Sequence, residues 1–364
     1  MFFQNDDIAI CRTKYYNFNF DKKTGYFERY GRTKKTEDDP AYSPIGPEIA
    51  DIEVTTICHG INNKPCAFCY KSNTSNGKNM SYDTFVKLFH KLPRTVTQIA
   101  FGVDSRAESN PDLFKIMDYC RNNNYNKVVP NITVAEISDE IADKLASVCG
   151  AVAVSRSSDK NICYNSVKKL IDRGLKQVNI HVMISEETYN NALETLKDKI
   201  TDKRLADLNA IVFLSLKKKG RGIGFTPLST EKFRKLVNFA FKHDIGIGFD
   251  SCSSGFFLET IKDLPNKEKL TESVESCESF GLFSSYFNVD GEYFPCSFVE
   301  GECEWENGLN VLNCNDFLKD IWYHPLVNEG RKRSIESAKE CPLDFVKDCR
   351  QCLYFEELNP WSKK

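Results

Sequence analysis

The sequence predicts an α/β protein built around a parallel sheet. Strand-like and helix-like segments alternate from residue 51 to about residue 250, and this alternation is typical of βα units whose strands pair in parallel. About six such units in series fit a closed or partial barrel, or a doubly wound sheet. In each of these arrangements, ligands bind at the carboxyl ends of the strands.

The individual elements follow from local pattern. Short runs rich in β-branched residues predict strands at 52–57, 98–102, 127–133, 151–155, 177–184, 210–216 and 245–250. Apolar residues at helical spacing predict helices at 81–92, 111–122, 138–148, 164–173, 187–199 and 229–242. Ser81, Ser138 and Ser229 are expected N-caps, and Gly174 is an expected C-cap.

The two ends of the chain differ from this series. Residues 15–21 and 25–30 alternate at period two around the turn 21–25, which predicts a β-hairpin. From residue 251 onward, turns, aromatic residues and cysteines become frequent, and we expect a small irregular domain there. The predicted domains are therefore 1–50, 51–250 and 251–364.

Composition excludes several classes of function. The 49 Lys and Arg residues nearly balance the 51 Asp and Glu residues, so no global field points to nucleic acid or to an anionic membrane. The stretch Lys217–Arg221 is expected to be a solvated loop. The first residues are acidic where a signal peptide is basic, and no apolar run of about 18 residues occurs. We therefore expect a cytoplasmic protein.

Three cysteines carry the clearest chemical signal. Cys58, Cys66 and Cys69 follow the β-branched run 52–57, with the second and third on a Gly/Asn/Pro loop. Three thiolates at a strand end form a soft metal site that leaves one metal position open. A structural zinc site completed by His59, or three buried free thiols, are the alternatives.

A second set of cysteines lies near the C-terminus. Of the chain's 15 cysteines, eight occur from Cys252 onward, and thiols are kept reduced in the cytosol. Clustered cytosolic cysteines favour a metal site over a disulfide framework. A zinc ribbon is one possible form of that site.

The first cysteine set resembles that of the radical S-adenosylmethionine (radical SAM) enzymes. Those enzymes carry C-x3-C-x2-C after the first barrel strand, with an aromatic residue before the third cysteine, a place that Phe68 occupies here. This chain has seven residues between Cys58 and Cys66. The resemblance implies a partial (β/α)6 TIM-like barrel with an N-terminal β-hairpin extension and a small irregular α+β C-terminal iron-sulfur domain. It also implies a [4Fe-4S] cluster on Cys58, Cys66 and Cys69.

The same resemblance implies a SAM site. Gly102 and Asp104 follow the second barrel strand, where family members hold the amino group of SAM. Ser155 ends the fourth strand and would contact the carboxylate or ribose of SAM. His181 would point into the barrel near the ribose, although a lone strand histidine is also an ordinary core residue.

The C-terminal cysteines resemble the SPASM/twitch extension of radical SAM peptide-modifying enzymes. Cys277, Gly291 and Cys296 match its C-x9–15-G-x4-C hairpin, and Cys349 and Cys352 form a C-x2-C pair. The longer run C-x2-C-x5-C-x3-C of the full pattern is absent from the sequence, so the resemblance implies one auxiliary [4Fe-4S] cluster. Its expected ligands are Cys277 and Cys296, with Cys252, Cys349 and Cys352 as further ligands and Cys341 as a competitor.

The resemblance implies an enzyme that cleaves SAM reductively to a 5′-deoxyadenosyl radical and takes hydrogen from a substrate. By family likeness the substrate is a ribosomally made peptide or protein that is crosslinked, epimerised or oxidised. A small-molecule substrate is the first alternative, and a zinc-stabilised βα binding protein is the second. The expected electron donor is a flavodoxin or ferredoxin, and no nucleic-acid or membrane partner is expected.

Overall fold

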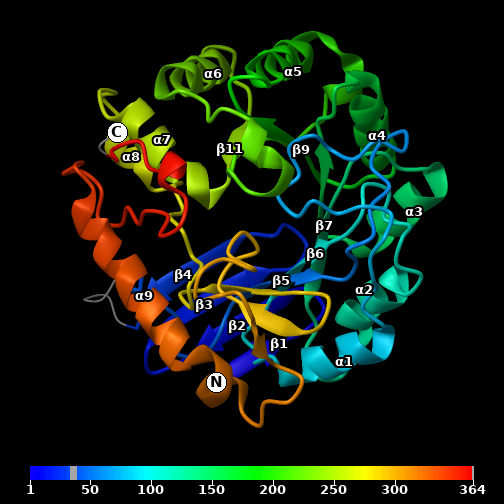
Figure 1. Ribbon diagram of the computed structural model, residues 1–364, viewed down its shortest axis with the longest axis vertical. Helices are drawn as coiled ribbons and strands as arrows, with labels where there is room; N and C mark the ends of the chain where they lie inside the picture. The colour runs from blue at the N-terminus through cyan, green and yellow to red at the C-terminus, as the bar shows by residue number, and fades with distance from the viewer. Residues whose placement is uncertain (33–38, 363–364) are drawn as a thin grey trace. The chain divides into compact units, whose positions relative to one another are not determined.

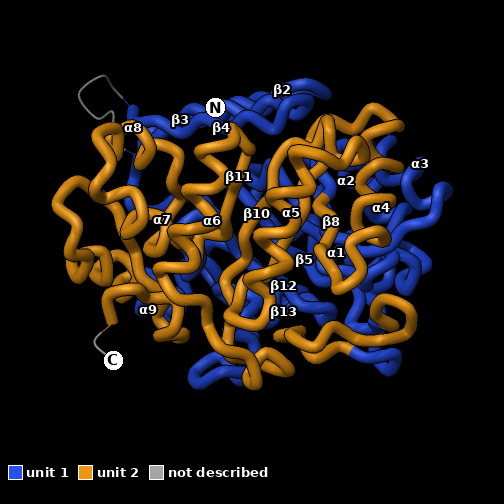
Figure 2. Tube along the Cα trace, turned by 90° about the horizontal axis from the view of Figure 1, so that it is seen from above, with its two compact units in different colours: residues 1–58, 74–152, 279–331 blue, residues 59–73, 153–278, 332–364 orange. Residues whose placement is uncertain are grey.

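The computed structural model describes residues 1–32 and 39–362, and its chain divides into two units (Figures 1 and 2). The first unit comprises residues 1–58, 74–152 and 279–331, and the second comprises 59–73, 153–278 and 332–364. Each unit is assembled from three separate stretches of sequence. The domain boundaries predicted at residues 50 and 250 describe another division and remain a prediction.

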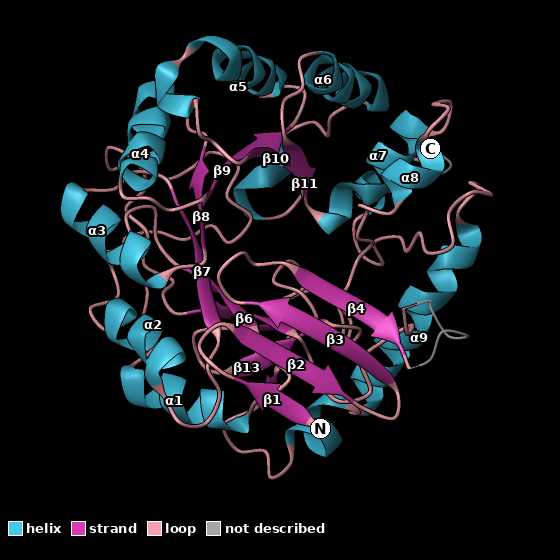
Figure 3. Cartoon of the chain, turned by 180° about the vertical axis from the view of Figure 1, so that it is seen from behind, coloured by secondary structure: helices cyan, strands magenta, loops and turns pink. Residues whose placement is uncertain are grey.

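An antiparallel sheet begins the first unit (Figure 3). Its strands β1 (Phe2–Gln4), β2 (Ile8–Arg12), β3 (Tyr16–Asp21) and β4 (Phe27–Gly31) pair in chain order. The predicted hairpin is confirmed as β3 and β4, with Phe20 opposite Phe27. The Asp21 carboxylate accepts the backbone N–H groups of Lys23 and Thr24, which stabilises the turn. The structure adds β1 and β2 to this hairpin.

The first unit also contains parallel βα elements. Strands β5 (Ile49–Glu53), β6 (Gln98–Gly102) and β7 (Val129–Val134) pair in parallel, with helices α1 (Tyr82–Lys91), α2 (Leu113–Asn122) and α3 (Asp139–Val148) between and after them. Ser81 and Ser138 cap α1 and α3 as predicted, since their side chains accept the N–H groups of Thr84 and Ile141.

A C-terminal extension joins the other edge of β5. Strand β12 (Ser284–Phe287) pairs with β5 in parallel, and β13 (Glu292–Phe294) and β14 (Leu309–Asn310) continue the sheet antiparallel. A π-helical turn (Leu318–Trp322) and helix α9 (Pro325–Ser337) follow, and the last residues of α9 belong to the second unit. This region is thus more regular than the sequence pattern predicted.

The second unit continues the βα series. Its strands lie in the order β11-β10-β9-β8, and β9, β10 and β11 pair in parallel. The strands are β8 (Ala151–Ser155, whose first residues belong to the first unit), β9 (Gln177–Ile184), β10 (Ala210–Ser215) and β11 (Ile247–Phe249). The helices are α4 (Lys160–Asp172), α5 (Tyr189–Thr201), α6 (Thr230–Lys242), α7 (Ser254–Ile261) and α8 (Lys267–Thr271).

Alternation along β9 shows how the sheet of the second unit divides its two faces. Val178, Ile180 and Val182 are at most 1% exposed, whereas the intervening His181 is half-buried. Successive strand residues point to opposite faces, so His181 lies on the face opposite this apolar row.

One predicted strand end is wrong. The run 52–57 was expected to be one strand, but β5 ends at Glu53. Beyond that point the chain pairs with residues 74–80: the N–H of Thr56 donates to Lys78 and that of Cys58 donates to Thr74. The β-branched run therefore continues beyond the last residue of β5, and Cys58 lies five residues after the end of that strand.

Within the described residues, no helix has both the length and the apolar character needed to cross a membrane.

Candidate metal and S-adenosylmethionine site

The seven residues between Cys58 and Cys66 contain a closed hairpin. Ile61 and Lys64 exchange backbone hydrogen bonds of 3.1 and 2.9 Å, and the residues between them, Asn62 and Asn63, have φ angles of 50° and 57°. Two consecutive positive φ angles are the signature of a type I′ turn, which asparagine tolerates better than most residues. We call residues 61–64 the loop hairpin.

Gly60 shows how tightly the loop hairpin closes. Its φ is +68°, and a Cβ placed on it would lie 2.0 Å from the Lys64 carbonyl oxygen and 2.6 Å from the Pro65 nitrogen. Only glycine fits this close approach. The backbone before the hairpin therefore lies directly against the backbone after it.

Cys66 and Cys69 lie on the next turn, which residues from the β10–α6 connection hold. We call residues 59–73 the cysteine loop; it belongs to the second unit. The backbone N–H of Arg221 donates to the Cys69 carbonyl at 3.0 Å, and its Nε donates to the Cys66 carbonyl at 2.8 Å. Its two terminal nitrogens lie 3.3 Å from the Asn73 carbonyl. Arg221 thus binds both ends of the C-x2-C turn.

The expectation that Lys217–Arg221 forms a solvated loop is wrong for its two ends. The Arg221 side chain is hydrogen-bonded to backbone carbonyl groups of the cysteine loop. Lys217 is 5% exposed and forms an ion pair with Asp250. A run of basic residues cannot reveal such burial, because the partners come from distant segments.

The three predicted cluster ligands are all half-buried. Cys58 belongs to the first unit, whereas Cys66 and Cys69 belong to the second. Throughout the described part of the chain, no group of three or more His, Cys, Asp or Glu side chains forms a metal site. The assignment of a cluster to these cysteines remains a prediction.

Asp104 is engaged within its own loop in the first unit. Its carboxylate, 3% exposed, accepts the N–H groups of Arg106, Glu108 and Ser109 at 3.1–3.2 Å. These bonds stabilise the turn that follows Gly102. Its predicted role toward the amino group of SAM remains a prediction.

A second carboxylate near Gly102 was missed from the sequence. Glu53 pairs with Gly102 across β5 and β6 and is 4% exposed. It accepts a 3.1 Å hydrogen bond from Tyr286 Oη. Glu53 falls inside the predicted strand 52–57, so the sequence pattern did not reveal that it ends the strand.

The other predicted SAM residues lie in the second unit. Phe68 makes an edge-on contact with Phe225, with the ring centroids 6.1 Å apart. Ser155 is half-buried at the end of β8. Burial lowers the pKa of His181 to about 4, although the Asp250 carboxylate opposes that shift. His181 is therefore neutral at neutral pH.

Three C-terminal cysteines of the second unit are linked by their effects on one another's pKa. Burial raises the pKa of Cys252 well above its usual value, Lys217 opposes the shift, and Asp250, Cys352 and Cys277 add to it. Burial raises the pKa of Cys352 to about 11, again with a contribution from Cys277. We call Cys252, Cys277 and Cys352 the three-thiol group.

Hydrogen bonds join the segment around Cys277 to residues 348–350, and an ion pair forms two residues before Cys252. Arg350 Nε donates to the Cys277 carbonyl at 2.8 Å, and Ser276 Oγ donates to the Asp348 carbonyl at 2.7 Å. Asp250 pairs with Lys217 and accepts a 2.5 Å bond from Ser253 Oγ. The sequence placed Lys217 and Asp250 at the carboxyl ends of adjacent strands, a signal that could have identified this pair.

The remaining candidate ligands have other surroundings. Burial and a hydrogen bond with Cys341 raise the pKa of Cys349. Cys296 belongs to the first unit, where its sulfur accepts the backbone N–H of Phe298 at 3.4 Å. Such N–H···S bonds are among the interactions that tune iron-sulfur clusters.

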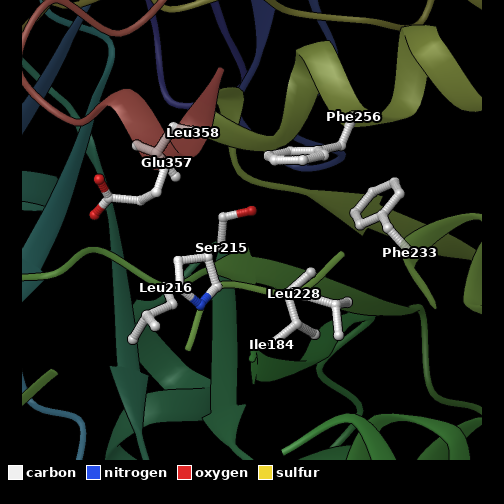
Figure 4. Close-up of a pocket in the computed structure, with 9 residues that line it drawn as sticks. Ile184, Ser215, Leu216, Leu228, Phe233, Phe256, Glu357 and Leu358 are labelled. Carbon is white, nitrogen blue, oxygen red and sulfur yellow. The ribbon is translucent and has the colours of Figure 1, made fainter. Parts of the chain in front are cut away.

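A small pocket, which we call the β10 cavity, lies beside the end of β10 in the second unit (Figure 4). Ile184, Leu228 and Phe233 supply apolar walls. Its polar lining residues are bonded within the protein: Ser215 Oγ contacts Ser253 Oγ at 2.7 Å, and Glu357 accepts the Lys218 N–H at 2.7 Å. The cavity shows no catalytic arrangement.

No protein-family model and no curated protein matches the chain. Among solved structures, the chain is similar to SuiB of Streptococcus suis bound to the precursor peptide SuiA, with 13% identity and a TM-score of 0.71 over 97% of this chain and 95% of that one. It has a weaker likeness to a radical SAM methyltransferase from Sphaerobacter thermophilus, with 10% identity and a TM-score of 0.42 over 68% and 75% of the two chains. The likeness to SuiB shows a shared mixed α/β fold with a large parallel sheet.

Proposed function

We propose that the protein is a radical SAM enzyme whose first [4Fe-4S] cluster is held by Cys58, Cys66 and Cys69. The observation that carries this proposal is the cysteine loop, a C-x2-C turn that follows the first strand of a βα series. Three thiolates suit a cluster with one iron left for another ligand. The shared fold with SuiB supports the proposal.

The residues around this cluster would bind and orient SAM. When bound, the cluster supplies the electron that cleaves SAM to a 5′-deoxyadenosyl radical. Gly102 would offer its backbone carbonyl to the ammonium of SAM, with Asp104 or Glu53 as the nearby carboxylate. Ser155 would bind the carboxylate or ribose. Neutral His181 can donate or accept one hydrogen bond to the ribose.

We propose that the three-thiol group forms part of a second [4Fe-4S] site. Its thiols influence one another's pKa and lie near the Lys217 ammonium, and nearby positive charge favours thiolates. Cys296 is the proposed fourth ligand. Cys349 remains a weaker candidate because its thiol is hydrogen-bonded to Cys341. This cluster would relay an electron from the substrate radical.

The proposed substrate is a ribosomally made peptide or protein, which the enzyme would crosslink, epimerise or oxidise. SuiB, which shares the fold, was solved with a precursor peptide. A flavodoxin or ferredoxin would supply the electron. Co-expression with each small open reading frame adjacent to the gene, followed by mass spectrometry, tests this substrate class. A mass change on a small molecule, with every peptide unchanged, would favour the small-molecule alternative.

SAM cleavage tests the reaction itself. Anaerobically purified protein with dithionite and SAM should form 5′-deoxyadenosine. The Cys66→Ala and Cys69→Ala variants should form none. Cys303→Ala is the matched control, because Cys303 is an exposed thiol outside both proposed sites. Unchanged cleavage in the two loop variants would refute the assignment.

A further inference from the structure

The irregular spacing of the cysteine loop has a geometric explanation, which rests on the proposed function. The loop hairpin begins and ends at Ile61 and Lys64, which are bonded to each other. Gly60 already lies against Lys64 and Pro65. If residues 61–64 were removed, His59, Gly60 and Pro65 would remain between the two cysteines. Residues 61–64 therefore project from the cysteine loop, because Gly60 and Pro65 on either side of them lie close together.

Arg221, and not the loop hairpin, makes the hydrogen bonds that hold the turn with Cys66 and Cys69. Its side chain and backbone bind the Cys66, Cys69 and Asn73 carbonyls, and hydrogen bonds from a charged donor are stronger than neutral ones. Two glycines bring this segment close to the loop. A Cβ on Gly220 would lie 2.3 Å from the Tyr70 carbonyl oxygen, and one on Gly222 would lie 3.3 Å from the Phe68 carbonyl oxygen.

The loop hairpin and Arg221 also differ in solvent exposure. Asn62, Asn63 and Lys64 are exposed, whereas Arg221 is half-buried. Solvent-facing turn tips tolerate insertion and deletion because few contacts are lost. The Arg221 guanidinium is bonded to the Cys66 and Asn73 carbonyl groups and cannot be removed without leaving both of them unpaired.

We propose that Arg221 is the positioning residue of the cysteine loop, and that the loop hairpin is an insertion which the site can lose without losing its cluster. The loop is held in place by the β10–α6 connection, and the hairpin extends from it. The position of the thiols thus depends on a residue about 150 positions away along the chain.

Hydrogen exchange on the metal-free protein tests the positioning role independently of any cluster. Arg221→Gln should make the amides of residues 66–73 exchange about tenfold faster, the effect of losing roughly one charged hydrogen bond. Arg221→Lys should restore part of the protection. Deletion of residues 61–64 should leave these rates unchanged, as should Lys218→Met, an exposed lysine in the same segment. Wild-type exchange rates in Arg221→Gln would overturn the proposal.

Electron paramagnetic resonance on reconstituted protein tests the consequence for the cluster. The deletion variant should keep the SAM-induced change in the cluster signal, and Arg221→Gln should lose it while the second cluster's signal remains. Loss of the first cluster in a deletion variant with wild-type Tm would overturn the proposal. Absence of iron from the wild-type protein would instead overturn the proposed function, and the exchange experiment would still decide the role of Arg221.

Discussion

The two cysteine groups of the second unit differ in how they are built. Cys66 and Cys69 are neighbours in the sequence, lie half-buried on one turn, and are held by Arg221 through backbone carbonyl groups. The three-thiol group is assembled from three separate segments, and burial raises the pKa of Cys252 and Cys352. The cysteines of both groups are half-buried, so the two sites differ in how they are assembled: one is local in sequence, whereas the other joins distant segments.

The two proposed sites have different chemical tasks. A site that binds SAM must admit an external ligand to its metal, so its thiols cannot be fully enclosed. A site that only relays electrons can be closed, and its potential is then set by nearby charges and by solvent exclusion. Buried thiols are protonated without metal and release those protons when metal binds.

The largest predicted effect is loss of the site at Cys58, Cys66 and Cys69. The triple variant Cys58→Ala, Cys66→Ala, Cys69→Ala should lose about half of its iron and all SAM cleavage, because one of two clusters is removed. Iron analysis and 5′-deoxyadenosine chromatography measure both. Cys303→Ala should match the wild-type protein. Full iron content in the triple variant would show that these three cysteines do not hold a cluster.

Loss of the three-thiol group should separate SAM cleavage from product formation. Variants Cys252→Ala, Cys277→Ala and Cys352→Ala should each lose about half of the iron but still cleave SAM, since the first cluster is independent. Substrate conversion should stop. Loss of cleavage together with iron, in protein with normal far-UV circular dichroism, would contradict the independence of the sites.

Charges beside the three-thiol group should tune its potential in opposite directions. Asp250→Asn removes a negative charge and should raise the reduction potential of the second cluster by roughly 60 mV, a tenfold change in the equilibrium constant for one electron. Lys217→Met should lower it by a similar amount. Redox titration measures both shifts, with Lys218→Met as the exposed control. Shifts of the same sign in both variants would exclude an electrostatic effect.

The smallest predicted effect is the pH dependence of stability contributed by His181. Its pKa is about 4 in the folded protein and near 6.5 when unfolded. As the pH falls from about 6.5 to about 4, the unfolded chain binds a proton that the folded protein excludes, so stability is lost. The loss is at most about 3 kcal/mol. Urea unfolding of the metal-free protein should show it in the wild type and not in His181→Gln. If the free energy of unfolding changed with pH equally in both proteins, the low pKa of His181 would be contradicted.

Local signals predicted the elements of the βα series well. Strands 98–102, 151–155 and 177–184 occur where their patterns predicted them, and side-chain capping by Ser81 and Ser138 is observed. These features depend on neighbouring residues alone. The end of β5 was misplaced because a β-branched run reports propensity, not the length of the partner strand.

Features that join distant segments were beyond the reach of the sequence. Nothing near Arg221 in the sequence reveals that it is bonded to the cysteine loop. The grouping of Cys252 with Cys277 and Cys352 likewise depends on where three loops fold. Helix α9 was missed because its buried positions include Gly330 and Arg331, which do not mark an apolar stripe.

Metal and sulfide analysis of anaerobically purified protein, combined with its absorption spectrum, tests the central claim most directly. Two [4Fe-4S] clusters predict about eight irons and eight sulfides per chain and a brown protein with broad absorption near 400 nm. Colourless protein with stoichiometric zinc and no sulfide would contradict the account and would favour a zinc-stabilised βα binding protein.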